Sequence, residues 1–107
     1  MKVAFHPLAE RDYMEAFHFY LSRQVRVATR FDRAVSKIVA SLQTRTDIGW
    51  PHLGETRQER VPGFPYGVIF VSRDDFTLVV AVAHSSRKPG YWTDRIPSNF
   101  VSGTPFE

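Results

Sequence analysis

The segment at residues 76–84, Phe-Thr-Leu-Val-Val-Ala-Val-Ala-His, constrains the fold more than any other part of the chain. Its middle is apolar almost throughout and rich in valine, which is typical of a β-strand. An apolar run without polar residues at alternate positions predicts a strand that is covered on at least one face. We therefore expect residues 76–84 to form a central strand, and other parts of the chain must cover it.

Two further extended segments precede this strand. Residues 56–61 carry polar and charged side chains and end at Pro62-Gly63, and residues 66–72 form a β-branched and aromatic run that ends at Arg73-Asp74-Asp75. Short strands separated by such turn-forming residues are typical of antiparallel neighbours. The three segments therefore predict an antiparallel β-meander, and residues 3–5 predict a short strand near the N-terminus.

Two amphipathic helices are expected between the first strand and the meander. Pro7 suits the first position of a helix, because its missing N–H would have no partner there. Apolar residues recur at helical spacing over residues 9–21 and again over residues 25–43. The apolar positions are Ala9, Tyr13, Ala16, Phe17 and Tyr20 in the first helix and Phe31, Ala34, Val35, Ile38 and Leu42 in the second. We expect this helical hairpin to cover the sheet, with Phe31 and Ile38 packed against Val80.

These elements predict the fold class α+β, with an N-terminal strand and a helical hairpin packed on an antiparallel β-meander. The 107 residues suit one domain, expected over residues 1–97, and residues 98–107 predict a loose C-terminal tail. Because the chain has no cysteine, it cannot form a disulfide scaffold, a Cys-ligated zinc site or a thiolate nucleophile. No segment predicts a signal peptide or a membrane span, so we expect a cytoplasmic protein without a membrane partner.

The chain is basic, with a net charge of +3, and eleven of its fourteen basic residues are Arg. The guanidinium group of Arg forms forked contacts with phosphate and carboxylate groups. Five basic residues cluster on the polar side of the second helix, and we call them the basic ridge: Arg23, Arg26, Arg30, Arg33 and Lys37. Asp32 is the acid expected near them. The basic ridge predicts either a contact with an anionic partner or a solvated face that maintains solubility.

The densest set of chemically active side chains follows the central strand, at residues 84–95. His84 can titrate near neutral pH. The candidate target-binding residues are Arg87, Lys88, Tyr91, Trp92 and Arg95, whose cations can hold phosphates and whose rings can stack on bases. The alternative is structural: each aromatic ring seals the sheet edge, and His84 forms a hydrogen bond at the strand end. We expect packing for each ring alone and a binding role for the cluster.

Other kinds of site are not indicated. The sequence has no P-loop, GxGxxG, HExxH or GxSxG motif. Asp12 and Glu15 lack an apolar pocket that would adapt one carboxyl group to acid–base catalysis. His6 and Glu10 lie four residues apart, but without a third ligand nearby they favour a helix cap or a surface pair over a metal site. We therefore expect neither a metal nor a cofactor.

Several motifs together resemble the RelE/ParE superfamily of bacterial toxins, and in particular its ParE-like branch. They are the opening Val-Ala-Phe-His-Pro-Leu-Ala at residues 3–9, Tyr20, Arg30-Phe31, Phe-Pro-Tyr-Gly-Val-Ile-Phe at residues 64–70 and His-x-x-Arg-x-Pro-x-Tyr-Trp-x-x-Arg at residues 84–95. The resemblance covers residues 3–96 and implies the same helical hairpin on an antiparallel sheet. It also implies the toxin of a type II toxin–antitoxin (plasmid stabilisation) system, which a cognate antitoxin neutralises.

The resemblance implies two competing mechanisms. ParE-like members poison DNA gyrase without a recognised catalytic centre, whereas RelE-like members cleave mRNA on the ribosome with basic residues of the sheet and a terminal tyrosine. RelE-type ribonucleases commonly have an arginine where this chain has Gly67, so growth arrest by gyrase inhibition is the favoured interpretation. For a ribonuclease, the candidate catalytic residues are Arg87, Tyr91, His84 and Arg60. A nontoxic domain that binds nucleic acid or protein is the third interpretation.

Overall fold

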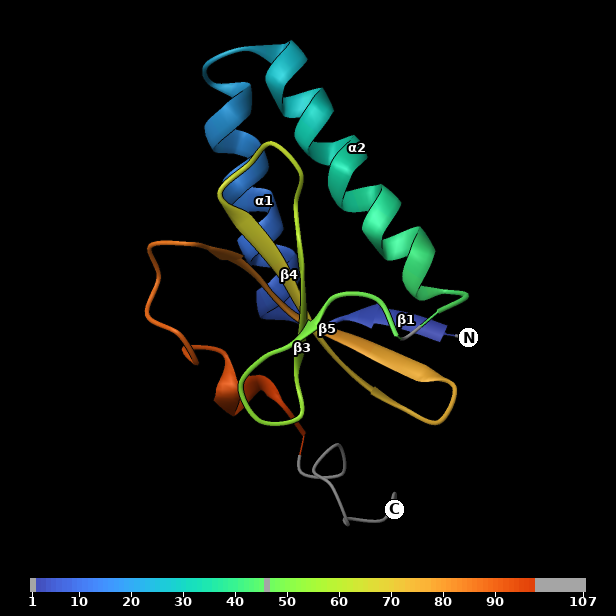
Figure 1. The fold of residues 1–107 in the computed structure, drawn as a ribbon. Helices are drawn as coiled ribbons and strands as arrows, with labels where there is room; N and C mark the ends of the chain where they lie inside the picture. Colours follow the sequence, from blue (N-terminus) through green and yellow to red (C-terminus); the bar gives the residue numbers. More distant parts are fainter. Residues whose placement is uncertain (1, 46, 98–107) are drawn as a thin grey trace.

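The computed structural model describes residues 2–45 and 47–97 of the chain (Figure 1). In chain order the elements are β1 (Lys2–Phe5), α1 (Pro7–Leu21), α2 (Val25–Leu42), β2 (Trp50–Pro51), β3 (Arg57–Arg60), β4 (Tyr66–Arg73), β5 (Phe76–His84) and a 3-10 helix (Thr93–Arg95). This order confirms the predicted α+β class. The tail expected at residues 98–107 lies outside the described residues.

The sheet has five strands in the order β1-β5-β4-β3-β2. The strands β3, β4 and β5 pair antiparallel, which confirms the predicted meander. β1 pairs parallel with residues 76–79 of β5, so β5 lies inside the sheet as expected. A parallel pair needs a crossover between its strands, and the helical hairpin begins this connection. The sequence analysis missed β2, which is only two residues long.

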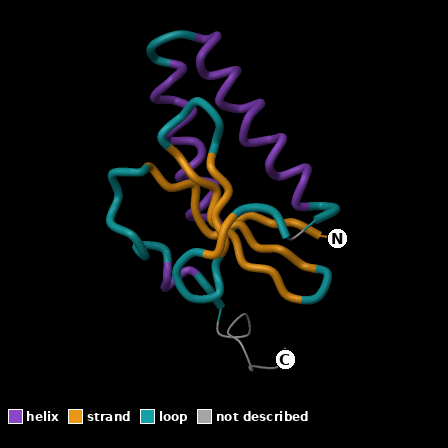
Figure 2. Tube along the Cα trace, in the orientation of Figure 1, coloured by secondary structure: helices purple, strands orange, loops and turns teal. Residues whose placement is uncertain are grey.

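The helices α1 and α2 lie side by side as a hairpin (Figure 2). Pro7 opens α1, and His6 caps it, because His6 Nδ1 accepts a hydrogen bond from the N–H of Leu8 at 3.0 Å. The capping interpretation of His6 is therefore confirmed. Arg23 lies in the turn before α2 rather than on it, because its N–H bonds to the carbonyl oxygen of Tyr20 and closes the end of α1. Within the described residues, no helix is long and apolar enough to cross a membrane.

Apolar side chains form two clusters, and each contains residues of β5. The first joins the helical hairpin to the sheet and includes Phe31, Ile38 and Val79. The second includes Val80 and Trp92, and because successive side chains of a strand point to opposite faces, it covers the other face of the sheet. The predicted contact of Val80 with Phe31 and Ile38 is therefore wrong. Both sets of alternate positions in β5 are apolar, so the sequence pattern could not determine which set faces the helices.

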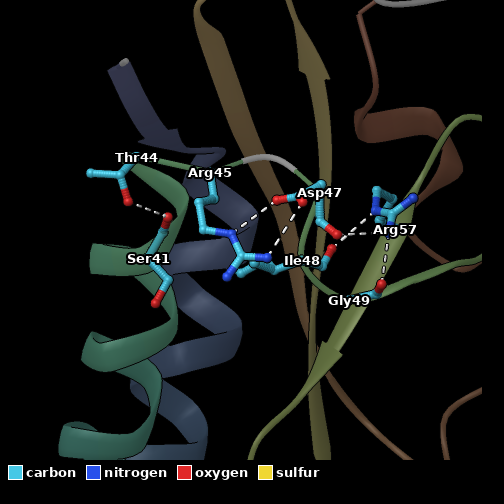
Figure 3. Close-up of polar contacts among 7 residues, drawn as sticks. All are labelled: Ser41, Thr44, Arg45, Asp47, Ile48, Gly49 and Arg57. Carbon is cyan, nitrogen blue, oxygen red and sulfur yellow. Dashed lines mark hydrogen bonds and ion pairs between the residues drawn. The ribbon is translucent and has the colours of Figure 1, made fainter.

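Arg57 of β3 ties the loop between α2 and β2 to the sheet. Its guanidinium group donates hydrogen bonds to the carbonyl oxygens of Ile48 at 3.0 Å and Gly49 at 2.7 Å (Figure 3). Gly49 has a φ of 75°, and a Cβ atom there would lie 2.5 Å from the carbonyl oxygen of Gln58. Only glycine avoids both the strained backbone and this clash. The loop therefore crosses close to β3, with Arg57 satisfying its carbonyl groups.

Candidate functional site

A pocket of about 200 Å³ lies where β5 ends, next to the end of β3 and the start of β4. The described residues that line it are His52, Gln58, Arg60, Tyr66, Gly67, Ala83, His84, Ser85, Arg87, Pro89 and Trp92. The fold thus brings together four residues that the sequence analysis selected: Arg60, His84, Arg87 and Trp92. It adds His52 and Gln58, which no sequence motif indicated, because they come from a loop and from a polar strand.

Arg87 and Lys88 are exposed in the loop that follows β5. The guanidinium carbon of Arg87 lies 3.9 Å from the centroid of the Tyr91 ring, which is a cation–π contact. This contact orders a long side chain that would otherwise be free to rotate in solvent. Arg87 and Tyr91 therefore present a forked cation beside an aromatic ring, a combination common at the centres of protein interfaces.

The hydroxyl group of Tyr91 points inward and donates a hydrogen bond to Asp12 Oδ2 at 3.1 Å. Burial, reinforced by the negative charge of Asp12, raises the pKa of Tyr91 to about 12. The phenol therefore keeps its proton at neutral pH and shares it with a carboxylate of the protein. Tyr91 is arranged to position its ring rather than to release a proton.

Arg95 lies in the interior, although the sequence analysis selected it as a residue that contacts a target. Its Nη1 atom lies 2.8 Å from Asp12 Oδ2, and the Arg95 and Asp12 side chains are each only 10% exposed. The same nitrogen donates a hydrogen bond to the carbonyl oxygen of Val80 at 2.9 Å. Because these acceptors surround the guanidinium group, Arg95 binds the C-terminal segment to α1 and β5 and is largely withdrawn from the surface.

Asp12 and Arg95 also form hydrogen bonds with backbone groups of β5 where its strand pairing is interrupted. The pairing register between β4 and β5 shifts at Val80, which has no opposite residue on β4, and β1 pairs with β5 only over residues 76–79. Arg95 bonds to the carbonyl group of Val80, and the N–H of Val82 donates to Asp12 Oδ2 at 3.2 Å. Two charged side chains thus satisfy backbone groups that a neighbouring strand would otherwise bond.

The structural role of Asp12 was missed in the sequence analysis, although a signal for it exists. Asp12 lies three residues after Ala9 and four before Ala16, and both alanines are buried. Helical spacing therefore places this acid on the covered side of α1. A buried acid needs a partner, but Arg95 is 83 residues away in sequence, so no local pattern identifies it.

Trp92 is 2% exposed and belongs to the second apolar cluster. The ring of His52 stacks on the indole with a centroid distance of 5.3 Å. The packing interpretation of Trp92 is therefore confirmed. Its buried Nε1 atom has no hydrogen-bond partner among the residues that the structure describes.

His84 is held in one tautomer by its neighbours. Its Nδ1 atom accepts a hydrogen bond from the N–H of Ser86 at 3.0 Å, and its ring packs against Tyr66 with a centroid distance of 5.0 Å. Because Nδ1 is an acceptor, the proton of the neutral imidazole is on Nε2. His84 therefore has a hydrogen-bond donor at Nε2 and no free lone pair there to act as a general base.

Gly67 lies on β4 opposite Arg60 of β3 and opposite Ala83 of β5. A Cβ atom at this position would lie 2.7 Å from Oε1 of Gln58. The side chain of Gln58 thus occupies the space that a larger residue at position 67 would need. At this position the pocket is lined by a neutral amide and by backbone.

Four residues of the basic ridge are exposed on α2: Arg26, Arg30, Arg33 and Lys37. Asp32 was expected to lie near them as the neutralising acid, but it accepts a hydrogen bond from the hydroxyl group of Tyr13 on α1. Burial and this contact with Asp32 together raise the pKa of Tyr13. Asp32 therefore joins the two helices, and it forms no ion pair with a described residue of the basic ridge.

Side chains that could ligate a metal do not cluster in the part of the chain that the structure describes. Residues 2–45 and 47–97 contain no group of three or more His, Asp or Glu side chains placed to hold a metal ion. His6 caps α1, while Glu10 and His18 are exposed.

Comparisons with known proteins agree with this fold. The family model for the ParE toxin of the type II toxin–antitoxin system parDE matches residues 3–89. No curated protein shows significant sequence similarity. Among solved structures, the chain is similar to one described as the chromosomal ParDE TA system from P. aeruginosa, with a TM-score of 0.70 and 15% sequence identity over 78% of this chain and 95% of the other. Since the family model spans most of the sequence, the chain belongs to the ParE family of toxins of type II toxin–antitoxin systems.

Proposed function

We propose that this ParE-family toxin arrests bacterial growth by binding and inhibiting DNA gyrase in the cytoplasm, without catalysing a reaction of its own. A cognate antitoxin neutralises it. The contact with gyrase is made by the segment that follows β5, with the exposed Arg87 and Lys88 supplying charge and the partly buried Tyr91 ring supplying aromatic surface.

The observation that carries the non-catalytic mechanism is the arrangement at Gly67. Cleavage of RNA without a metal ion requires a cation that stabilises the charge developing on the phosphorane. Gln58 fills the space beside Gly67, where the RelE-type ribonucleases commonly have an arginine. The pocket therefore has an amide at the strand position where such an enzyme would have a positive charge, and its own arginines, Arg60 and Arg87, come from other positions.

The candidate proton-transfer groups support the same proposal. The hydroxyl proton of Tyr91 is held by Asp12, and the pKa of Tyr91 is raised to about 12, so this phenol is a weak general acid at neutral pH. Nε2 of His84 carries the imidazole proton, because Nδ1 is occupied by the N–H of Ser86. Neither group is prepared to take a proton from a ribose hydroxyl.

The proposal is tested by adding purified protein to a gyrase supercoiling assay. Inhibition is expected for the natural protein, and Arg87→Ala should raise the concentration for half inhibition by roughly thirtyfold, the effect of losing one hot-spot contact. Tyr91→Phe keeps the ring and removes only the hydroxyl group, so it should change inhibition little. Arg11→Ala, which removes an exposed cation from α1, is the matched control.

A ribonuclease would give the opposite result in these experiments. A ribonuclease would cut mRNA in translating ribosomes and leave purified gyrase unaffected, and Tyr91→Phe would slow cutting by about a hundredfold or more, the scale of a lost general acid. That result would overturn the gyrase proposal.

Toxicity is tested separately in cells. Induced expression of the protein alone should stop bacterial growth, and co-expression of the antitoxin encoded beside it should restore growth. Normal growth with soluble, folded protein would support the interpretation of a nontoxic binding domain.

A further inference from the structure

The pocket at the end of β5 has a chemical character that gyrase binding does not explain. Its charged lining residues are Arg60 and Arg87, and none of the described lining residues is Asp or Glu. Neither arginine forms an ion pair with a described acid. Two arginines therefore line a small pocket whose described lining contains no carboxylate.

The neutral polar groups of the pocket add further hydrogen-bond donors. His84 has its proton on Nε2, since Nδ1 accepts from the N–H of Ser86 at 3.0 Å. Gln58 offers an amide NH₂ group and Ser85 offers a hydroxyl group. The pocket thus combines charged and neutral donors from two strands and from the loop after β5.

Trp92 forms an apolar wall of the same pocket. The Trp92 side chain lines the pocket, is 2% exposed, and has a buried Nε1–H without an acceptor among the described residues. Because this nitrogen is enclosed by the protein, the Trp92 ring is a wall of the pocket and not one of its hydrogen-bond donors.

We infer that this pocket binds a phosphoryl group, held between Arg60 and Arg87 and accepting hydrogen bonds from the neutral donors around them. A tetrahedral phosphoryl group has acceptor oxygens on several sides, which suits donors that come from β3, from the end of β5 and from the following loop. A planar carboxylate has two oxygens and leaves more of these donors unpaired. Phosphoryl binding involves no chemical reaction, and it can be present whether or not the protein inhibits gyrase.

Nuclear magnetic resonance offers a direct test, because the chain has only two tryptophans. The indole N–H of Trp92 reports on the pocket, and that of Trp50, which is 77% exposed, serves as an internal reference. Labelled protein near neutral pH is titrated, at constant ionic strength, with inorganic phosphate, with adenosine 5′-monophosphate and with sodium acetate as the carboxylate comparison.

We expect both phosphates to shift the Trp92 indole signal and the amide signals of Ser85 and Ser86 in a saturable way, while the Trp50 signal stays in place. Arg60→Gln and Arg87→Gln should each raise the dissociation constant by about tenfold or more, as expected for the loss of a charged hydrogen bond. Arg11→Gln removes the same charge from the exposed surface of α1 and should leave the dissociation constant unchanged.

A short single-stranded oligonucleotide distinguishes the source of the phosphoryl group. Tighter binding than the mononucleotide, with the same shifted signals, would identify a nucleic acid backbone, and a response to the small phosphates alone would identify a phosphorylated small molecule. The inference is overturned if phosphate leaves the Trp92 signal in place, if acetate binds as tightly as phosphate, or if both Arg→Gln variants bind like the natural protein.

Discussion

Arginine side chains lie in opposite environments in two regions of this protein, the C-terminal segment and the outer face of α2. Arg95 is 10% exposed and bonds to Asp12 and to the backbone of Val80. Arg26 and Arg33 of the basic ridge lie on the exposed side of α2, and neither forms an ion pair with a described acid. The same side chain is a structural connector in one region and a surface charge in the other.

The difference teaches that the acceptors around a cation, rather than the cation itself, determine its role. A guanidinium group can be buried only where anions and carbonyl groups replace the water that it loses. Asp12 and the bulge in β5 supply those acceptors for Arg95. The outer face of α2 supplies none among the described residues, so its cations remain hydrated and available to a partner.

The largest loss of stability is expected for Arg95→Ala. This change leaves the Asp12 carboxylate buried without its cation and removes a hydrogen bond from the Val80 carbonyl, so it should lower the free energy of unfolding by about 3–5 kcal/mol. Urea denaturation followed by circular dichroism measures it. The double variant Asp12→Asn/Arg95→Met should recover part of the loss, because no unpaired charge remains. A loss below about 1 kcal/mol in Arg95→Ala would show that the pair is solvated.

A smaller effect is expected for Tyr91→Phe. The variant removes the hydrogen bond to Asp12 but leaves that carboxylate paired with Arg95, so the free energy of unfolding should fall by about 1–2 kcal/mol. The same denaturation experiment measures it. In the Asp12→Asn/Arg95→Met background the loss should be smaller, because the acceptor is no longer charged, and equal losses in both backgrounds would contradict the contact.

Alkaline pH provides a third test of the buried region. The pKa of Tyr91 is about 12 in the folded protein, above its ordinary value of 10, so folding favours the protonated phenol. This contribution to stability is complete below pH 10 and is lost as the pH rises from 10 to 12. The urea midpoint should therefore fall across this window, and it should fall less in Tyr91→Phe. The decline should not vanish in that variant, because the pKa of Tyr13 is also raised.

The smallest effect on stability is expected in the basic ridge. Replacing Arg26, Arg30 and Arg33 by Gln should change the free energy of unfolding by less than about 0.5 kcal/mol per residue, because these side chains are exposed. If the ridge contacts an acidic segment of the antitoxin, the triple variant should bind it more weakly and with a flatter dependence on salt. Calorimetry at low and high salt measures the affinity for the antitoxin and its dependence on salt. Unchanged affinity would assign the ridge to the solvated face.

Much of the fold was predictable, because it follows from local patterns. Helical spacing predicted α1 and α2, and β-branched runs predicted β4 and β5, in each case to within two residues of the observed bounds. The parallel partner of β1 and the two-residue β2 were not predictable, because neither has a distinctive pattern. The face of the sheet on which Val80 lies was also undetermined, since its neighbours in β5 are equally apolar.

The candidate site was predictable only as a set of residues. The sequence selected Arg60, His84, Arg87 and Trp92, and the fold brings them to one pocket. It did not reveal that Trp92 is a wall of that pocket, since an aromatic ring suits both a core and a binding surface. Nor did it reveal Gln58, whose side chain occupies the space beside Gly67 on the next strand.

By itself, then, the sequence determined the elements and their order, the abundance of cations, and the family to which the chain belongs. All three follow from which residues occur and in what order along the chain. Only the tertiary structure decided which cations are buried. Asp12 and Arg95 are 83 residues apart, and they meet because α1 and the C-terminal segment both reach the interrupted edge of β5. Whether a charge is paired inside or hydrated outside depends on neighbours that only folding brings together.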